Sequence, residues 1–420
     1  MRAELRDALL SARATTERLT ARLGDAQARA QFDPGFSPLG WHLGHVAWQE
    51  ERWVLRRCAG ERPIDPGLDG IYDSFHSHKG SRGRRLPPLV RIRSYAALVR
   101  ERLLAFLERT DFEGDLLAGG WVFRFLANHE RQHAETMAAA LLLGHLQPEL
   151  EVAPPVAASA GEGWCDFLPV EGGRFSLGCD DDPDGWDNER CAHEVELAPF
   201  AIARQPVTNG AFLAFLEAGG YRDDGLWSEA GRRWRDAEGV EAPLHWRRGA
   251  GCWERWTLGG WRPVDPSHPV SHLGWHEAEA FARWAGARLP TEAEWERAAG
   301  WEQGGRKRRF PWGDGAPAPG VNVALARGDT APCGSEASPC GAEGMGGNVW
   351  EWTASPFLPW PRFEPGPYRG YSAPWFGDRH RVLRGGCWMS DPAMARTTFR
   401  NWFEPQVRAF PAGLRLARNR

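Results

Sequence analysis

The chain has 420 residues, a net charge of −4 and 42% hydrophobic residues, which is enough for two or three domains with ordinary cores. This charge provides no basic field for nucleic acid, and no apolar run approaches the roughly 18 residues that cross a bilayer. The N-terminus, Met1 to Asp7, is charged and has no secretory hydrophobic region. We therefore expect a cytoplasmic protein with no nucleic-acid partner and no membrane partner.

Residues 1–149 have the composition of a helical bundle, rich in Ala, Leu, Arg and Glu. Apolar side chains recur with helical spacing in four stretches: residues 5–19, Trp41 to Cys58, Tyr95 to Leu107 and Trp121 to Leu143. Four helices joined by loops predict an up-and-down bundle. The segment from Gly60 to Arg93 is long and basic, and a loop of that length is usually functional or mobile.

The composition changes after residues 150–163, which we interpret as a linker. Short strands, glycine turns and short helices alternate through residues 164–420. We expect helices at Asn209 to Ala218, Trp275 to Gly286 and Glu292 to Ala299, the last one after a capping box formed by Thr291 and Glu294. The chain is therefore expected to be an α+β protein of two domains, residues 1–149 and 164–420.

Three histidines of the first domain are candidate metal ligands. His129 and His133 are four residues apart in a predicted helix, so their side chains leave the same face one turn apart. His45 lies in a second predicted helix. Three neutral imidazoles would leave positions open on an ion and suit iron, zinc, copper or nickel. The alternative for each histidine alone is an ordinary core or surface position. The eight cysteines form no CxxC pair, which argues against a zinc ribbon.

Six motifs of the second domain carry a resemblance: Gly172 to Gly178, Gln205 to Asn209, Pro269 to Trp275, Arg288 to Glu296, Gly346 to Trp352 and Arg384 to Trp388. They resemble the formylglycine-generating-enzyme (sulfatase-modifying factor) fold, a C-type-lectin-like α+β module. Formylglycine enzymes carry two copper-binding cysteines after the last motif; this chain has none there, so that activity is not expected. The resemblance allows a structural calcium ion at Asn322 and Asn348 to Glu351; the alternative is a hydrogen-bonded turn without metal.

A helical bundle with this histidine pattern, fused to such a module, resembles the ergothioneine-type sulfoxide synthases. The resemblance implies a DinB-like four-helix bundle that binds Fe(II) through His45, His129 and His133. His45 is preferred to His42 because it matches the family ligand in the Leu-Gly-His motif; His42 then supports the helix start or a ligand. Glu130 and Glu135 are not expected to be ligands. The implied reaction uses O2 to form a carbon–chalcogen bond at imidazole C2 of hercynine, which is Nα-trimethylhistidine.

The resemblance also implies the hercynine contacts. Gln132 matches the residue that contacts the substrate imidazole, and Asn401 and Trp402 match an Asn-Trp pair that holds its ammonium and carboxylate end. A quaternary ammonium has no N–H to donate, so it needs aromatic faces. Tyr368 matches the acid that delivers a proton or hydrogen atom to oxygen, and Tyr371 the residue that orders water and substrate. Core packing is the alternative for these aromatic residues.

The donor site departs from the family pattern. Basic residues between Ser77 and Pro87 would clamp the carboxylates of a thiol co-substrate, and Lys79 and Arg82 align best, although Lys79 replaces an arginine. Enzymes that use γ-glutamylcysteine have an acid where this chain has Phe403. These departures favour the related selenoneine synthases, whose donor is a selenosugar, and we expect the apolar Phe403 to stack on that sugar. The alternatives are γ-glutamylcysteine or cysteine as donor, an O2-independent DinB-type thiol transferase, a non-catalytic carbohydrate- or peptide-binding protein and, for the basic segment, a solvated loop.

Overall fold

The structure is a computed structural model that describes residues 1–150, 163–334 and 336–420. The chain divides into two compact units, unit 1 with residues Met1–Leu150 and unit 2 with residues Glu151–Arg420. The predicted linker falls on residues 151–162 for almost all of its length and so lies outside the described residues.

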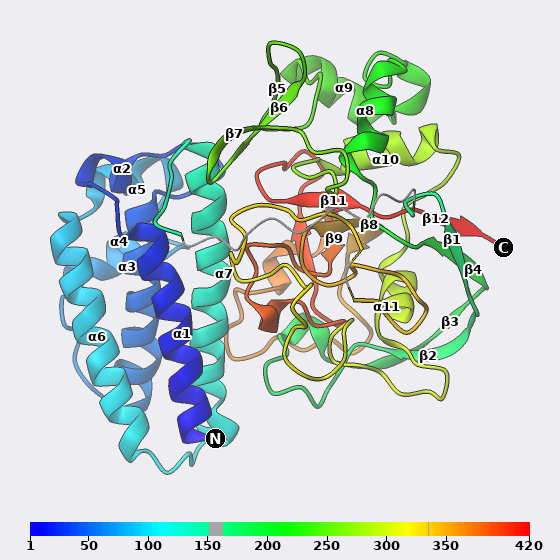
Figure 1. Cartoon of the computed structure of the whole chain (residues 1–420). Coiled ribbons are helices and arrows are strands. Elements are labelled where there is room, and N and C mark those ends of the chain that lie inside the picture. The colour runs from blue at the N-terminus through cyan, green and yellow to red at the C-terminus, as the bar shows by residue number, and fades with distance from the viewer. Residues whose placement is uncertain (151–162, 335) are drawn as a thin grey trace. The chain divides into compact units, whose positions relative to one another are not determined.

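Unit 1 is a helical bundle (Figure 1). Its helices are α1 (Arg2–Thr20), α2 (Asp25–Arg29), α3 (Leu39–Glu50), α4 (Asp69–Tyr72), α5 (Lys79–Arg85), α6 (Leu89–Arg109) and α7 (Trp121–Leu143). The long helices α1, α3, α6 and α7 run side by side, with α1 packed on α7 and α3 on α6. In α1 the buried residues Leu5, Leu9, Ala12 and Leu19 follow the helical period. The predicted four-helix bundle is confirmed.

Two features of unit 1 were not predicted. Helix α3 continues directly into a π-helix, Glu51–Cys58, within the stretch predicted as one helix. The prediction of one long loop from Gly60 to Arg93 is wrong. This segment contains a 3-10 turn (Pro66–Leu68), α4, α5 and the start of α6. The Asp65 carboxylate caps the 3-10 turn by accepting from Gly67 N at 2.9 Å. Helices of four and seven residues are too short to leave a periodic pattern in the sequence.

Unit 2 combines short helices with small sheets. Its helices are α8 (Asn209–Glu217), α9 (Glu229–Glu238), α10 (Trp275–Trp284) and α11 (Glu292–Gly300). Its strands are β1 (Phe167–Val170), β2 (Gly173–Leu177), β3 (His193–Leu197), β4 (Phe200–Ala203), β5 (Trp246–Arg248), β6 (Trp253–Thr257), β7 (Gly260–Pro263), β8 (Trp350–Phe357), β9 (Gly377–Arg384), β10 (Asn401–Phe403), β11 (Ala412–Leu414) and β12 (Ala417–Asn419). The predicted C-type-lectin-like α+β fold is confirmed.

The strands of unit 2 form four sheets, in the orders β10-β9-β8-β11, β1-β4-β12, β5-β6-β7 and β2-β3. All pairs are antiparallel except β8 with β11. Helix α11 begins where the capping box was predicted: Thr291 Oγ1 accepts from Glu294 N at 3.2 Å, and the Glu294 carboxylate accepts from Thr291 N at 2.8 Å. Trp295 of α11 is fully buried in a core with Ile202 and Met345.

Buried ion pairs hold the irregular segments of unit 2. Four fully buried arginines each pair with a glutamate: Arg384 with Glu296, Arg396 with Glu189, Arg400 with Glu292 and Arg415 with Glu351. The partners lie from 64 to 207 residues apart in the chain. Arginine suits this task because its planar group donates several hydrogen bonds in fixed directions, so one side chain can tie distant loops together.

Candidate metal centre and substrate residues

The three histidines predicted as metal ligands lie together in unit 1. One nitrogen atom from each of His45, His129 and His133 lies within 4.8 Å of the other two. His45 comes from α3, and His129 and His133 come from successive turns of α7. In the part of the chain that the structure describes, no other group of three histidine, cysteine or acidic side chains has this geometry.

Tyr72 fixes the ring of His45. His45 Nδ1 lies 2.7 Å from the Tyr72 carbonyl oxygen, which can only accept, so Nδ1 carries the proton and the lone pair is on Nε2. Gly44 makes this contact possible, because a Cβ at residue 44 would lie 2.1 Å from the Tyr72 ring. The glycine of the Leu-Gly-His motif is therefore required by the close approach of Tyr72.

His42 contacts the third candidate ligand. Nδ1 of His42 and Nδ1 of His133 are 2.8 Å apart, and His42 is buried. If His133 binds an ion through Nε2, its Nδ1 keeps the proton and donates it to His42. His42 then supports a ligand, which is one of the two roles expected for it.

Burial keeps these imidazoles neutral. The pKa values of His42, His45 and His129 are well below the ordinary value, first because burial disfavours the charged ring and then because the other histidines are close. Burial also lowers the pKa of His133, to about 4. Because only a neutral imidazole has a lone pair for a metal, the cluster is ready to bind an ion at neutral pH.

Glu130 lies between the two α7 histidines in sequence but belongs to a ring of buried charges. Its carboxylate accepts from Arg13 Nε at 2.7 Å and from Arg100 at 2.6 Å, and both arginines also pair with Glu50. This ring of charges joins α1, α3, α6 and α7. Two of these helices, α3 and α7, carry the three histidines. Glu130 is thus committed to the bundle, in agreement with the expectation that it is not a ligand. Gln132 lies on α7 next to His133 and is half-buried.

In unit 2 the structure brings together the predicted substrate residues from two segments. The ring of Tyr371 meets that of Trp402 edge to face, with centroids 5.4 Å apart, and lies 6.5 Å from the ring of Tyr368. Trp402 stacks on Phe357 at 4.3 Å. Asn401 Oδ1 accepts from Trp402 N at 2.9 Å, which leaves its amide Nδ2 for other partners. The four predicted residues Tyr368, Tyr371, Asn401 and Trp402 therefore belong to one aromatic and polar cluster.

Sequence reasoning missed two members of this cluster. Trp186 stacks on Tyr371 with ring centroids 3.8 Å apart. The buried carboxylate of Asp187 accepts hydrogen bonds from the Ser372 hydroxyl and from Gly366 N, and so holds the loop that carries the tyrosines. Burial raises the pKa of Asp187 above its ordinary value. An isolated Trp-Asp pair in an acidic loop gives no sequence signal for this role.

Phe403 does not join the cluster. It follows Trp402 in β10, and successive residues of a strand point to opposite faces. Its ring stacks on Phe410, with centroids 4.3 Å apart. Within the described residues, Phe403 is a packing residue of the sheet, so the expectation that it contacts the donor has no support from its ring contacts.

The basic segment lines a hollow in unit 1. The hollow has a volume of about 740 Å³ and is lined by residues 31–34, residues 74–80 and Arg82. Lys79 is exposed and donates to the Gly35 carbonyl at 2.6 Å. The two predicted donor-site residues therefore share one surface, which also carries the exposed ring of Phe75.

Arg82 is buried and already bonded. Its guanidinium donates to oxygen atoms of its own unit: the Ser74 carbonyl (3.1 Å), the Ser77 carbonyl (2.9 Å) and hydroxyl (3.1 Å) and the Ser37 hydroxyl. It lies 3.8 Å from the ring of Trp41, which in turn stacks on His45 at 4.4 Å. No carboxylate of the described residues contributes to its pKa, which burial lowers to about 10.

The contacts around Asn348 favour the turn without calcium. Asn348 Oδ1 accepts from Asn322 Nδ2 at 3.0 Å and from Ala331 N at 2.8 Å, and its Nδ2 donates to the Ala331 carbonyl. The Glu351 carboxylate is taken by Arg415 at 2.8 Å. A calcium ion needs about six to eight oxygen ligands. The side-chain oxygens of Asn348 and Glu351 are committed to protein donors, and among the predicted side-chain ligands within the described residues only Asn322 Oδ1 accepts from no donor.

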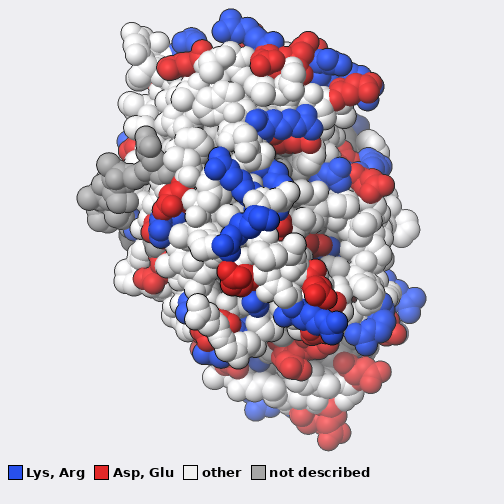
Figure 2. Space-filling view, turned by 90° about the vertical axis from the view of Figure 1, so that its right-hand side faces the viewer, with Lys and Arg blue, Asp and Glu red and all other residues white. Residues whose placement is uncertain are grey.

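Two surface properties bear on partners. On the face drawn in Figure 2, basic and acidic side chains are interspersed among the described residues, without the continuous basic surface typical of nucleic-acid binding. No helix in the described ranges has both the length and the apolar character that a bilayer crossing requires.

Comparisons with known proteins agree with both units. Residues 8–137 match the DinB superfamily, and residues 157–420 match the sulfatase-modifying factor enzyme 1-like domain. The chain is 44% identical to the hercynine oxygenase of Mycobacterium tuberculosis over 97% of each chain, and 44% identical to that of Mycolicibacterium thermoresistibile over 99% of this chain and 95% of the relative. Its identity with the formylglycine-generating enzyme of Streptomyces coelicolor is 35%, over 57% of this chain and 86% of that enzyme. Because the matches to the mycobacterial proteins include both units, this chain belongs to the hercynine oxygenase family.

Proposed function

We propose that this protein is a non-haem iron oxygenase that uses O2 to form a carbon–chalcogen bond at imidazole C2 of hercynine. The observation that carries the proposal is the cluster of His45, His129 and His133, in which one nitrogen atom of each ring lies within 4.8 Å of the other two. His45 and His129 are buried and His133 is half-buried, and the lowered pKa values keep all three rings neutral. Its occurrence in a chain 44% identical to hercynine oxygenases over nearly the full length supports the substrate.

The three histidines would hold Fe(II). His45 has its Nδ1 bonded to Tyr72, and His133 has its Nδ1 bonded to His42, so each presents Nε2. Iron would supply the redox chemistry that activates oxygen, and the open positions left by three ligands would admit substrates. Glu130 is held by Arg13 and Arg100, so its carboxylate is not available as a ligand.

Unit 2 would supply most of the hercynine contacts. The aromatic faces of Trp402 and Tyr371 suit a trimethylammonium group, which has no hydrogen to donate. Asn401 would bind its polar end through the free side of its amide, and Gln132 of unit 1 would contact the imidazole. These assignments follow the family pattern and the grouping of the residues in the structure.

Tyr368 would be the acid. Its phenol would deliver a proton or hydrogen atom to oxygen, and Tyr371, 6.5 Å away and stacked on Trp186, would order water and substrate. The Asp187 carboxylate would keep their loop in place through Ser372.

The donor we favour is a selenosugar, as in the selenoneine synthases. Arg82 supports this choice, because its donors are used by four oxygen atoms of its own unit and a carboxylate clamp needs free ones. A sugar has hydroxyl groups and no carboxylate, and so it does not require the clamp. Lys79, which is exposed, keeps γ-glutamylcysteine or cysteine as the alternative.

Product analysis tests the proposal. The iron-loaded protein would be incubated with hercynine and, separately, a selenosugar, γ-glutamylcysteine and cysteine, in air and without oxygen, and the products identified by mass spectrometry. We expect an oxygen-dependent adduct of hercynine, formed fastest with the selenosugar. If an adduct forms only with a thiol, the donor is that thiol and not a selenosugar. If turnover needs no oxygen, the protein is a thiol transferase and not an oxygenase.

A further inference from the structure

The side chain of Asn188 is buried without a hydrogen-bond partner. It is 2% exposed, and within the described residues neither Oδ1 nor Nδ2 reaches a donor or acceptor. Buried amides are almost always paired, because an unpaired polar group loses its hydrogen bonds to water and gains none in return. Asn188 therefore lowers the stability of the folded chain, and a residue of this kind calls for a partner that the chain itself does not provide.

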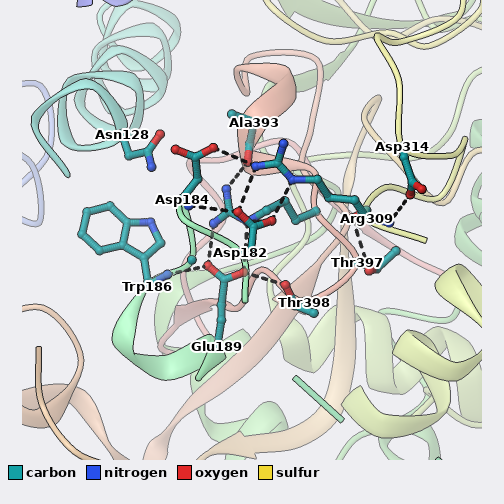
Figure 3. Close-up of polar contacts among 12 residues, drawn as sticks. Asn128, Asp182, Asp184, Trp186, Glu189, Arg309, Asp314, Ala393, Thr397 and Thr398 are labelled. Atoms are coloured by element: carbon teal, nitrogen blue, oxygen red, sulfur yellow. Dashed lines mark hydrogen bonds and ion pairs between the residues drawn. The ribbon is translucent and has the colours of Figure 1, made fainter. Parts of the chain in front are cut away.

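The loop that carries Asn188 is firmly held (Figure 3). Glu189 accepts from Trp186 N at 3.0 Å and from the Thr398 hydroxyl at 2.7 Å, and it pairs with the buried Arg396. Asp182 and Asp184, at the start of the loop, share Arg309 at 2.7 to 2.9 Å (Figure 3). The unpaired amide is thus set in a rigid frame, and its place is not the result of a loose segment.

The frame places residue 188 between the two segments that carry the proposed substrate contacts. Its neighbour Asp187 is bonded to Ser372, beside Tyr371. Its own carbonyl accepts from Arg400 at 3.2 Å, and Arg400 directly precedes Asn401 and Trp402. The backbone around residue 188 is therefore tied to both walls of the aromatic cluster.

We propose that Asn188 is a further hercynine-binding residue, and that its Nδ2 donates a hydrogen bond to the substrate carboxylate. The inference rests on the proposed function. Of the two groups at that end of hercynine, the trimethylammonium has no polar hydrogen and no lone pair, whereas the carboxylate accepts hydrogen bonds. An amide N–H is the matching donor, and a hydrogen bond to a charged group offsets the cost of the buried amide when substrate is bound.

The substitution Asn188→Leu tests this, because leucine keeps the number of side-chain heavy atoms and the branch at Cγ and removes the polar atoms. Full-length, iron-loaded protein would be kept without oxygen, and both the melting temperature and the Kd for hercynine would be measured. We expect an equal or higher melting temperature and a Kd raised roughly tenfold to a hundredfold. The control is Asn209→Leu: Asn209 is equally buried, but its Nδ2 donates to the Asp265 carbonyl at 2.7 Å, so the melting temperature should fall and the Kd stay unchanged.

An analogue of hercynine without the carboxylate identifies the contact. It should bind wild-type protein and Asn188→Leu equally well. A lower melting temperature of Asn188→Leu with an unchanged Kd would overturn the inference, since the amide would then be structural. An equal loss of affinity for hercynine and the analogue would overturn the carboxylate assignment. If wild-type protein binds no hercynine, the proposed function fails and the inference falls with it, whereas wild-type binding with unchanged binding by the variant removes the inference alone.

Discussion

In the sequence, the histidine cluster and the basic segment of unit 1 are equally good candidates for binding sites, since each is rich in residue types that bind ligands. In the structure they differ in what their side chains still have to offer. His45 and His133 each bond to a protein partner through Nδ1, and the Nε2 atom of each ring remains for a metal ion. Arg82 uses its guanidinium on oxygen atoms of its own unit. Unused bonding capacity, more than residue type, therefore separates a binding residue from a supporting one.

Removal of a metal ligand should have the largest effect of the substitutions that test this difference. His133→Ala leaves two imidazoles, and we expect loss of bound iron and of hercynine turnover, because two neutral ligands hold a divalent ion far more weakly than three. Iron per chain would be measured by elemental analysis after gel filtration. The control His145→Ala replaces an exposed histidine just beyond α7 and should keep full iron. Retained iron and turnover in His133→Ala would remove the metal site as proposed.

Arg82→Met should come next, as a loss of stability. The substitution leaves several buried oxygen atoms without a donor, which should lower the free energy of unfolding by about 3 kcal/mol. Lys79→Met is the matched control, because Lys79 is exposed and donates to the Gly35 carbonyl at the surface, so its substitution should cost at most about 0.5 kcal/mol. Urea unfolding measures both. If Arg82→Met keeps its stability and instead raises the KM for the donor, Arg82 belongs to the donor site.

His42→Phe should weaken the metal without abolishing it. Phenylalanine fills the space but cannot accept from Nδ1 of His133, so that ring loses its orienting partner. Loss of such a partner typically lowers metal affinity tenfold to a hundredfold. Competition with a chelator would measure the iron affinity at fixed pH. An affinity equal to that of wild type would show that His133 is oriented without His42.

The smallest effect concerns the pH dependence of the metal-free chain. The pKa of His42 is below 6.5 in the folded state, whereas an unfolded histidine titrates near 6.5. The unfolded chain therefore binds more protons below pH 6.5, and the free energy of unfolding falls as the pH falls from there. His42→Phe should reduce this slope by up to one proton, measured by urea unfolding of apo-protein between pH 7 and 5. An unchanged slope would mean that His42 is charged in the fold.

The elements with a periodic or capped sequence were predictable. Four apolar stripes gave the bundle, the Thr291–Glu294 pair marked the start of α11, and the four-residue spacing of His129 and His133 placed both on one face. Contacts between residues that are far apart in the chain could not be predicted, because they leave no local pattern in the sequence. Helices α4 and α5 are too short to show a periodic pattern, and the ring of Trp186 stacks on that of Tyr371, 185 positions away in the chain. The roles of the site residues stay predictions.

The ring of Arg13, Arg100, Glu50 and Glu130 has a consequence for how this family can vary. Two positive and two negative charges cancel inside the bundle, so a single neutral replacement would strand a buried charge at a cost of about 3–5 kcal/mol. Replacement of an arginine and a glutamate in the same lineage would avoid that cost. Aligned relatives should therefore show these four positions either intact or altered in oppositely charged pairs.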